Sequence, residues 1–219
     1  MTKNGETSRI RYDEGCLEAH ALNVIGDRWA LLVVRELMVV PKRFQAIRAG
    51  MPGITAGVLT QRLTQLIESG VVSHDPDLGV YGLTQSGLAL HPVLMALCHW
   101  GSQHQGHDPR RFISPTALML SMCAKIDRAA AAGQEVVAGF DMEREAFELR
   151  ISSDGSLTVK ATRKPEGDFL LRGNGNTLAR AVYGPEPVAR LAEAGVIGLI
   201  GDAARAQGFV DLFSLNNQG

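Results

Sequence analysis

The sequence predicts an α+β fold built in two parts, because the pattern of apolar residues changes once along the chain. Residues 14–107 carry long helical patterns and all six histidines. Residues 113–219 carry alternating strand patterns, then short helices, and no histidine. A polar segment that contains Gly106 and Pro109 separates the two parts, as a linker does. We therefore expect two domains, at residues 1–108 and 109–219, which is a natural division for 219 residues.

Composition limits the class of protein. An apolar fraction of 45% with 21% charged residues is typical of globular proteins. The sequence has no apolar run of the roughly 20 residues that would span a membrane, and the first 12 residues lack an apolar signal core. Three scattered cysteines are too few for a disulfide framework. These features favour a cytoplasmic protein that makes no membrane contact.

Helical periodicity and its punctuation predict the elements of the first half in order. Gly26 ends the first helix, Asp27 caps the second, and Thr55 caps the fourth, which Gly70 closes. Pro92 either kinks the last helical segment or begins a new one. The expected helices cover residues 16–25, 29–39, 43–49, 56–69 and 85–100, and the expected strands cover 71–73 and 80–83.

The helix expected at residues 56–69 has two contrasting faces. Its apolar stripe consists of Leu59, Leu63, Leu66 and Ile67. Its other face is uncharged and rich in hydrogen-bonding groups, with Ala56, Gly57, Thr60, Gln61, Thr64 and Gln65, and with Arg62 beside them. Thr and Gln donate and accept hydrogen bonds as base edges require, and Arg can pair with guanine or phosphate. A short helix, a turn, this helix and a two-stranded wing follow the winged helix-turn-helix order, which predicts binding to double-stranded DNA.

A basic patch supports this interpretation. No acidic residue occurs between Leu37 and Ile67, whereas four basic residues do, so this stretch can attract phosphates. The wing is less suited to contact DNA, because Asp75 and Asp77 would repel phosphates. The alternative is an ordinary solvated face of a surface helix. The predicted DNA-contacting residues are Lys42, Arg43, Arg48, Thr55, Ala56, Gly57, Thr60, Gln61, Arg62, Gln65 and His74.

Residues 14–105 resemble the HxlR family of winged helix-turn-helix regulators. The resemblance rests on Cys16-Leu17-Glu18-Ala19, Val24-Ile25-Gly26-Asp27-Arg28-Trp29, Leu31-Leu32, Arg35-Glu36-Leu37, Arg43-Phe44, Pro52-Gly53-Ile54, Leu59-Thr60-Gln61-Arg62-Leu63 and Tyr81-Gly82-Leu83-Thr84. It implies a homodimer built on the first helix and on the helix ending near Trp100, a recognition helix at 55–69, and action on promoters as repressor or activator. Two departures are Leu17, where the family often has Pro, and the short acidic wing.

Cys16 is a candidate redox sensor, because some members of that family sense oxidants through the corresponding cysteine. A helix N-terminus and the nearby Arg11 and Arg28 would favour its thiolate. The alternative is a half-buried cysteine that packs at the dimer interface. Cys98 and the histidines that follow it lack the spacing of metal ligands. We predict no metal site, no cofactor and no catalytic residue.

Alternating strands dominate the predicted second half. We expect a helix from residue 115 to about 131, strands at 136–140, 147–152, 157–161, 169–171 and 196–200, helices at 176–183 and 186–194, and a last helix capped by Asp202. Asp154-Gly155 marks a hairpin turn. The arrangement predicts a smaller α+β domain, with an antiparallel sheet covered by helices.

The second half is similar to the sterol-carrier-protein-like fold over residues 168–178, 183–187 and 201–213. This likeness implies an apolar tunnel that would bind a small-molecule effector or a lipid. The alternative is a filled core that serves dimerisation or a protein partner. The predicted pocket residues are Phe140, Phe147, Leu149, Phe169, Leu171, Phe209 and Phe213.

Together these patterns predict a homodimeric transcription regulator, acting as a repressor or autoregulator and responding to an apolar effector. The alternative is a non-enzymatic small-molecule or lipid carrier or sensor whose helical half only dimerises. We do not expect an enzyme, because residues 113–219 have no histidine. The glycine-rich run 173–176 also lacks the third glycine of a dinucleotide fingerprint and the lysine of a phosphate loop.

Overall fold

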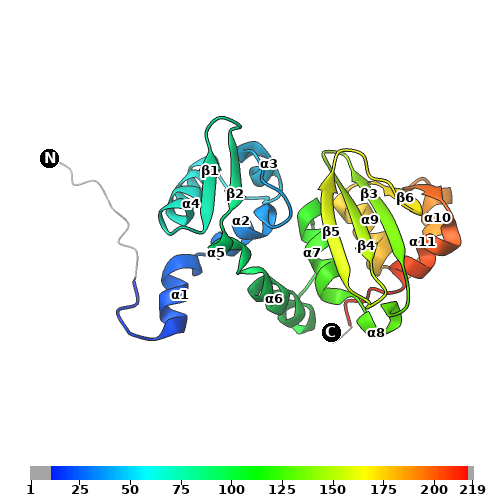
Figure 1. The fold of residues 1–219 in the computed structure, drawn as a ribbon, viewed down its shortest axis with the longest axis horizontal. Helices are drawn as coiled ribbons and strands as arrows, with labels where there is room; N and C mark the ends of the chain where they lie inside the picture. The colour runs from blue at the N-terminus through cyan, green and yellow to red at the C-terminus, as the bar shows by residue number, and fades with distance from the viewer. Residues whose placement is uncertain (1–10, 217–219) are drawn as a thin grey trace.

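The computed structural model describes residues 11–216, in which two hydrophobic cores are joined by the segment around residue 110 (Figure 1). The first half follows the order that the sequence predicts. Its elements are α1 (Leu17–Ile25), α2 (Ala30–Leu37), α3 (Phe44–Ala49), α4 (Ala56–Glu68), β1 (Val72–Asp75), β2 (Val80–Leu83), α5 (Gln85–Leu88) and α6 (His91–Gln103). Pro92 lies in the first turn of α6, so it begins a new helix and does not kink a longer one.

The predicted caps explain where α4 begins and ends. The Thr55 hydroxyl accepts a hydrogen bond from the Val58 backbone amide at 3.3 Å. Gly70 has a φ of 71°, the left-handed conformation that closes many helices. Behind the helix, Leu59, Leu63 and Leu66 are buried in the first core. The apolar stripe therefore holds α4 in a fixed orientation, with its other side toward solvent.

Ile67 was expected on this stripe and is instead exposed. At 100° per residue it lies about 80° around the helix from Leu59, at the edge of the surface that the core covers. The prediction for this residue is wrong for that reason.

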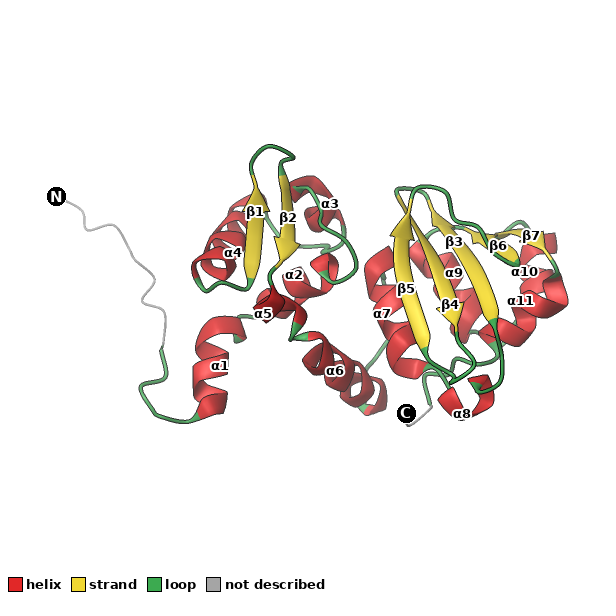
Figure 2. Ribbon diagram, in the orientation of Figure 1, coloured by secondary structure: helices red, strands yellow, loops and turns green. Residues whose placement is uncertain are grey.

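The second half is a five-stranded sheet with helices against one face (Figure 2). The strand order is β5-β4-β3-β6-β7. The elements are α7 (Pro115–Lys125), α8 (Arg128–Ala131), β3 (Val136–Met142), β4 (Glu145–Ile151), β5 (Leu157–Thr162), β6 (Phe169–Arg172), α9 (Gly175–Tyr183), α10 (Val188–Glu193), β7 (Gly198–Gly201) and α11 (Ala203–Val210).

Three expectations for this half need correction. The sheet is mixed and not antiparallel, because β3 and β6 run parallel. The helix expected from 115 to 131 breaks at Ile126, which is extended and forms a bridge with Phe213. Strand β7 was expected to be buried, but Gly198 and Ile200 are exposed because β7 is the edge of the sheet.

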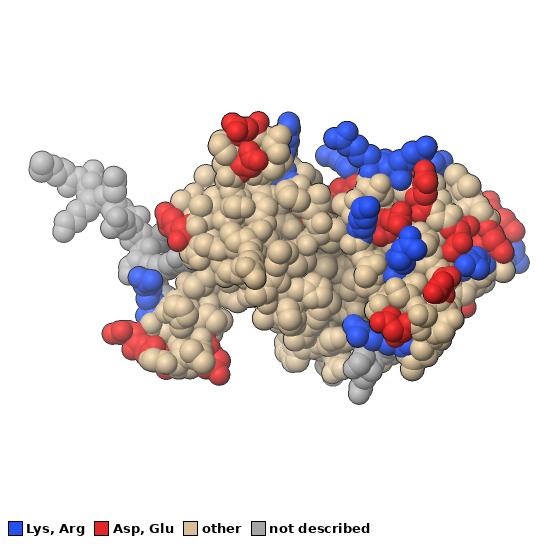
Figure 3. Space-filling view, viewed as in Figure 1, with Lys and Arg blue, Asp and Glu red and all other residues tan. Residues whose placement is uncertain are grey.

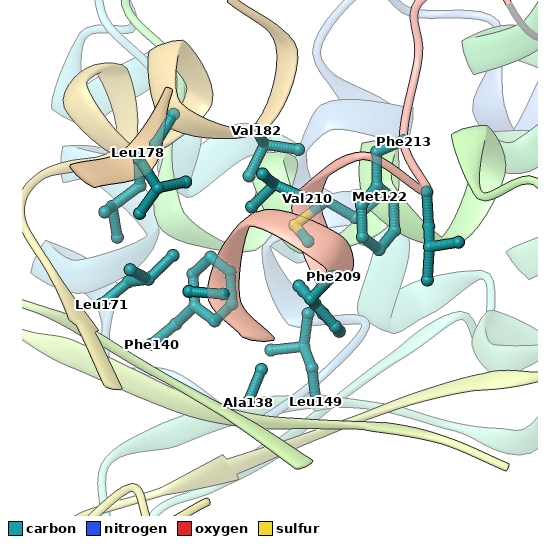
Figure 4. Packing of buried hydrophobic residues seen from close by; sticks show 14 of the residues in the cluster. Met122, Ala138, Phe140, Leu149, Leu171, Leu178, Val182, Phe209, Val210 and Phe213 are labelled. Carbon is teal, nitrogen blue, oxygen red and sulfur yellow. The ribbon is translucent and has the colours of Figure 1, made fainter. Parts of the chain in front are cut away.

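The predicted effector pocket is occupied by the protein's own side chains. The Phe209 ring lies 5.2 Å from that of Phe213, 5.5 Å from that of Phe169 and 6.2 Å from that of Phe140, centroid to centroid. Figure 4 shows Phe140, Phe209 and Phe213 among the apolar side chains packed around α11 and against the sheet. All seven residues predicted to line a tunnel belong to the second core: Phe140, Phe147, Leu149, Phe169, Leu171, Phe209 and Phe213. They form a filled core, which corrects the prediction that these residues line a pocket.

Candidate nucleic-acid interface

The outward side of α4 is exposed and carries no charge over its first nine residues. Thr55, Ala56, Gly57, Thr60, Gln61 and Thr64 are all exposed. The Thr60 hydroxyl donates to the Ala56 carbonyl at 3.0 Å, which leaves its oxygen able to accept from a partner. A methyl group added at Gly57 would meet nothing within 4 Å. We call this set of six residues the α4 outer face.

Arg62 does not belong to the α4 outer face, so its predicted role as a base reader needs correction. It is only 6% exposed, and its guanidinium pairs with Asp27 and hydrogen-bonds Gln65. Arg62 lies three residues after Leu59, about 60° from it around the helix, so its stem follows the buried stripe. Arg62 fastens α4 to the loop before α2. Gln65 is half-buried and takes part in the same contact.

Lys42 is also buried, at 5% exposure, which corrects its assignment to DNA phosphates. Its backbone forms an isolated bridge with Tyr81, so it adjoins β2 like a short third strand. Its ammonium donates to Glu36 Oε2 at 3.1 Å, to Thr116 Oγ1 at 2.8 Å and to Glu145 Oε1 at 2.7 Å. These partners leave the Lys42 charge neutralised inside the protein.

Two predicted phosphate contacts remain accessible. Arg43 and Arg48 are exposed at the start and near the end of α3. The tip of the wing carries exposed Asp75 and Asp77, and Figure 3 shows acidic side chains there. His74 is exposed on β1, with its ring 4.4 Å from that of Tyr81. The exposed predicted cations are therefore those of α3, whereas the tip of the wing is acidic.

Cys16 lies at the N-cap of α1, the helix N-terminus that the sequence predicts, and its side chain is exposed. Arg28, one of the two arginines expected near it, contacts another side chain. The Cys16 thiol donates to Glu18 at 3.0 Å, and this hydrogen bond lowers the pKa of Glu18. Arg28 instead lies over the Trp29 ring, 5.0 Å from its centroid. A role of Cys16 in sensing oxidants stays a prediction.

Apolar side chains are exposed on α1 and α6. Leu17 is 83% exposed and Trp100 is 64% exposed, and Leu22, Val93 and Leu97 are also exposed. The only buried residue of α1 is Ala19. Figure 2 shows α1 standing apart from the rest of the first half. A helix that buries so little against its own chain lacks the packing that normally stabilises a helix.

Sequence reasoning missed a buried polar junction between the two halves. Glu36 is fully buried in α2 and accepts from Arg35, Lys42 and, at 2.6 Å, from the Ser114 hydroxyl. Thr116 Oγ1 donates to Glu145 Oε2 at 3.2 Å, which extends the junction to β4. The signal was an acidic residue in a helix that is apolar apart from Arg35 and Glu36, because a buried charge requires partners. We call Glu36, Lys42, Ser114, Thr116 and Glu145 the polar junction.

Within residues 11–216 there is no group of three or more His, Cys, Asp or Glu side chains arranged to hold a metal ion. None of the helices described is both long and apolar enough to span a bilayer.

Comparison with known proteins identifies the first half. The HxlR-like helix-turn-helix family matches residues 24–109. An HTH-type transcriptional regulator of Methanothermobacter thermautotrophicus is 35% identical over 98 residues, which cover 42% of this chain and 75% of the relative. The HTH-type transcriptional regulator YvaP of Bacillus subtilis is 35% identical over 88 residues, 38% of this chain and 82% of the relative.

Among solved structures, quinone-bound YodB from B. subtilis is 33% identical and covers 41% of this chain and 99% of its own, with a TM-score of 0.37. The two curated relatives match over most of their own length, and the family match includes α2 to α6. The chain therefore belongs to the HxlR-like helix-turn-helix family of transcriptional regulators.

Proposed function

We propose that this chain is a homodimeric regulator that places the α4 outer face of each subunit in the major groove of promoter DNA. The observation that carries the proposal is that face itself, uncharged, exposed, and held from behind by Leu59, Leu63 and Leu66. Thr60 and Gln61 present the donors and acceptors that base edges require. An ordinary surface helix would gain solubility from charged residues on this side, and α4 has none here.

The beginning of α4 suits a phosphate. Ala56 and Gly57 are small and exposed, so a DNA strand could approach the free backbone amides of the first turn closely. Gly57 costs about 1 kcal/mol of helix stability relative to Ala, which stability alone does not explain. Arg43 and Arg48 would contact neighbouring phosphates from α3, which sets the register of the helix on the duplex.

Exposed apolar side chains support the homodimer. Leu17 and Leu22 on α1, with Leu97 and Trp100 on α6, provide surface that a second copy would cover. A twofold dimer would then present its two α4 helices to half-sites about 34–36 Å apart. Such a dimer would act at promoters, as a repressor or autoregulator of its own gene.

The readout is tested by fluorescence anisotropy against a labelled duplex from the region upstream of the gene. Gln61→Ala should change which base pair is preferred at one position of each half-site by about 1–3 kcal/mol, or roughly 5- to 150-fold. Gln85→Ala, an exposed glutamine on α5, is the matched control and should bind as the wild type. Unchanged preference in Gln61→Ala and Thr60→Ala would overturn the assignment of α4.

The dimer is tested by light scattering after size-exclusion chromatography. Leu97→Asp places a charge on the exposed face of α6 and should convert a dimer into a monomer. Leu78→Asp changes an exposed leucine at the wing and should leave the mass unchanged. A wild-type mass of one chain, or a Leu97→Asp variant that stays dimeric, would contradict the proposed interface.

A further inference from the structure

A cleft of about 500 Å³ lies between the helix-turn-helix and the sheet domain. One wall is α3, and the opposite wall is the turn between β3 and β4 together with the start of α9. The segment joining the halves closes the third side. We call this the interdomain cleft, defined by Ala46, Ala49, Phe112, Met142, Arg144 and Asn174. Ligand sites occur preferentially at such boundaries between domains.

The cleft offers an apolar surface with a few polar groups. Phe112 is 54% exposed, although a phenylalanine is usually buried. Ala46, Ala49 and Met142 extend the apolar lining. The Arg144 guanidinium is exposed, and among the residues described it has no ion pair or hydrogen bond. Glu145 is already committed to Lys42 and Thr116, so its charge is not available to a ligand.

The turn beside the cleft has an unusual backbone. Glu143 has a φ of 52°, the only positive φ at a non-glycine residue in the part of the chain described. Glu143 and Arg144 form the two-residue loop of the β3–β4 hairpin, and turns of this length use a positive φ, which fixes the direction in which the loop faces the cleft. Glu143 also lines the cleft, and its negative charge disfavours a ligand that carries more than one acidic group.

We propose that the interdomain cleft binds a small apolar organic molecule with one acidic group. Its apolar body would cover Phe112 and the exposed Ala46 and Ala49, and its acidic group would pair with Arg144. An effector would therefore bind in the interdomain cleft and not in the core of the second half, which is filled. The regulatory part of the proposal rests on the proposed DNA-binding function, and its binding part does not.

Contacts at the cleft explain how a ligand bound there would affect the DNA-binding elements. The hairpin that carries Arg144 also carries Glu145, which holds Lys42 at 2.7 Å. Lys42 in turn pairs with Glu36 in α2 and adjoins Tyr81 in β2. On the other wall, α3 carries both Ala46 and Arg48. A ligand that separates or draws together these walls therefore moves α3 relative to the polar junction.

Binding is tested by isothermal titration calorimetry with 1-anilinonaphthalene-8-sulfonate, an apolar probe with a single negative charge. The wild-type chain should bind one probe per subunit. Ala49→Trp fills the cleft and should weaken binding at least about tenfold, and Arg144→Gln should also weaken it. Ala179→Trp, in a separate pocket beside Tyr183, is the matched control and should bind as the wild type.

Absence of binding to the wild type, or equal binding to Ala49→Trp and the wild type, would overturn the proposal. Circular dichroism should first show that both tryptophan variants are folded. If Ala49→Trp is unfolded, Ala46→Leu and Arg144→Gln test the same site with smaller changes, and unaltered affinity in both would overturn it.

The regulatory part is tested by repeating the DNA titration at saturating probe. Linkage requires that the probe changes DNA affinity by the same factor by which DNA changes probe affinity, commonly about 5- to 150-fold. Ala49→Trp should abolish that change. A cleft that binds the probe without altering DNA affinity would overturn the regulatory part. A chain that binds the probe but no DNA would instead overturn the proposed function.

Discussion

Lys42 Nζ lies 2.7 Å from Glu145 Oε1 and so joins the helix-turn-helix to a hairpin 103 residues later in the chain. Lys42 also pairs with the fully buried Glu36, so a single ammonium serves carboxylates of both halves. Buried charges require such pairing, because each costs several kcal/mol to remove from water. The polar junction therefore holds together only when the two halves keep one arrangement.

We expect Lys42→Met to be destabilising, because it removes the ammonium that Glu36 and Glu145 share and leaves Arg35 as the remaining cation beside the buried Glu36. Breaking one side of a buried pair costs about 3–5 kcal/mol, and urea unfolding would measure the loss. Arg43→Met, at the exposed neighbouring position, should cost less than about 0.5 kcal/mol. Thr116→Val is a milder second variant and should cost about 1 kcal/mol. Equal stability of the two methionine variants would contradict the burial of Lys42.

Arg48→Ala should weaken binding to all DNA sequences alike. If Arg48 contacts one phosphate, the slope of log affinity against log salt should become shallower by about 0.9. Arg190→Ala removes another exposed arginine, on α10 and far from α3 in the chain, and should leave the slope unchanged. Anisotropy titrations at several salt concentrations measure both slopes. An unchanged slope for Arg48→Ala would remove Arg48 from the interface.

Local features of the first half could be predicted because they depend on neighbouring residues. The Thr55 cap, the Gly70 terminus and the leucine stripe of α4 are all determined within about 16 residues of sequence. Arg62 and Lys42 could not be placed in this way. Their burial depends on Asp27 and on Glu145, which are remote in sequence, and sequence periodicity alone does not reveal such pairs.

The second half shows the same limit at the level of the sheet. Alternation identified β4 and β5 and the hairpin that joins them, because antiparallel neighbours are consecutive in sequence. The parallel pairing of β3 with β6 depends on where the chain goes after β5, which alternation does not specify. Likewise, the apolar residues of a tunnel and of a filled core follow the same pattern. Only the position of α11 shows that Phe209 fills the space.

Phe209→Ala should therefore behave as a deletion from a packed core. The variant removes a ring that contacts Phe140, Phe169 and Phe213, and we expect a loss of about 3–5 kcal/mol in the free energy of unfolding. Phe112→Ala, which truncates a half-exposed ring at the interdomain cleft, should cost much less. Chemical denaturation would compare the two. A loss below about 1 kcal/mol for Phe209→Ala would indicate space around the ring.

The three cysteines should react with iodoacetamide at different rates at pH 8. Burial raises the pKa of the Cys123 thiol to about 11 and also raises the pKa of Cys98, so little of either thiol is ionised at that pH. Cys16 is exposed and should be alkylated first. Mass spectrometry of timed digests measures the order, and denaturation in urea should remove the difference. Early labelling of Cys123 in the folded chain would contradict its environment.

Asp168→Asn should destabilise the protein in a manner that depends on pH. The Val137 backbone amide donates to Asp168 Oδ2 at 2.9 Å and Arg205 donates at 3.1 Å, and these contacts lower the pKa of the carboxyl group. A carboxyl group whose pKa is lower in the folded chain contributes stability above its unfolded pKa of about 3.9, and this contribution is lost as the pH falls through the folded value.

Wild type should therefore be more stable than Asp168→Asn at pH 7, by an amount that solvent screening of the 36% exposed carboxylate keeps small, and the difference should shrink below pH 4. Urea unfolding at both pH values measures it. Asp77→Asn, at the exposed tip of the wing, should change stability little at either pH. A penalty for Asp168→Asn that stays constant from pH 7 to pH 3 would show that the charge of Asp168 does not hold β3 beside β6.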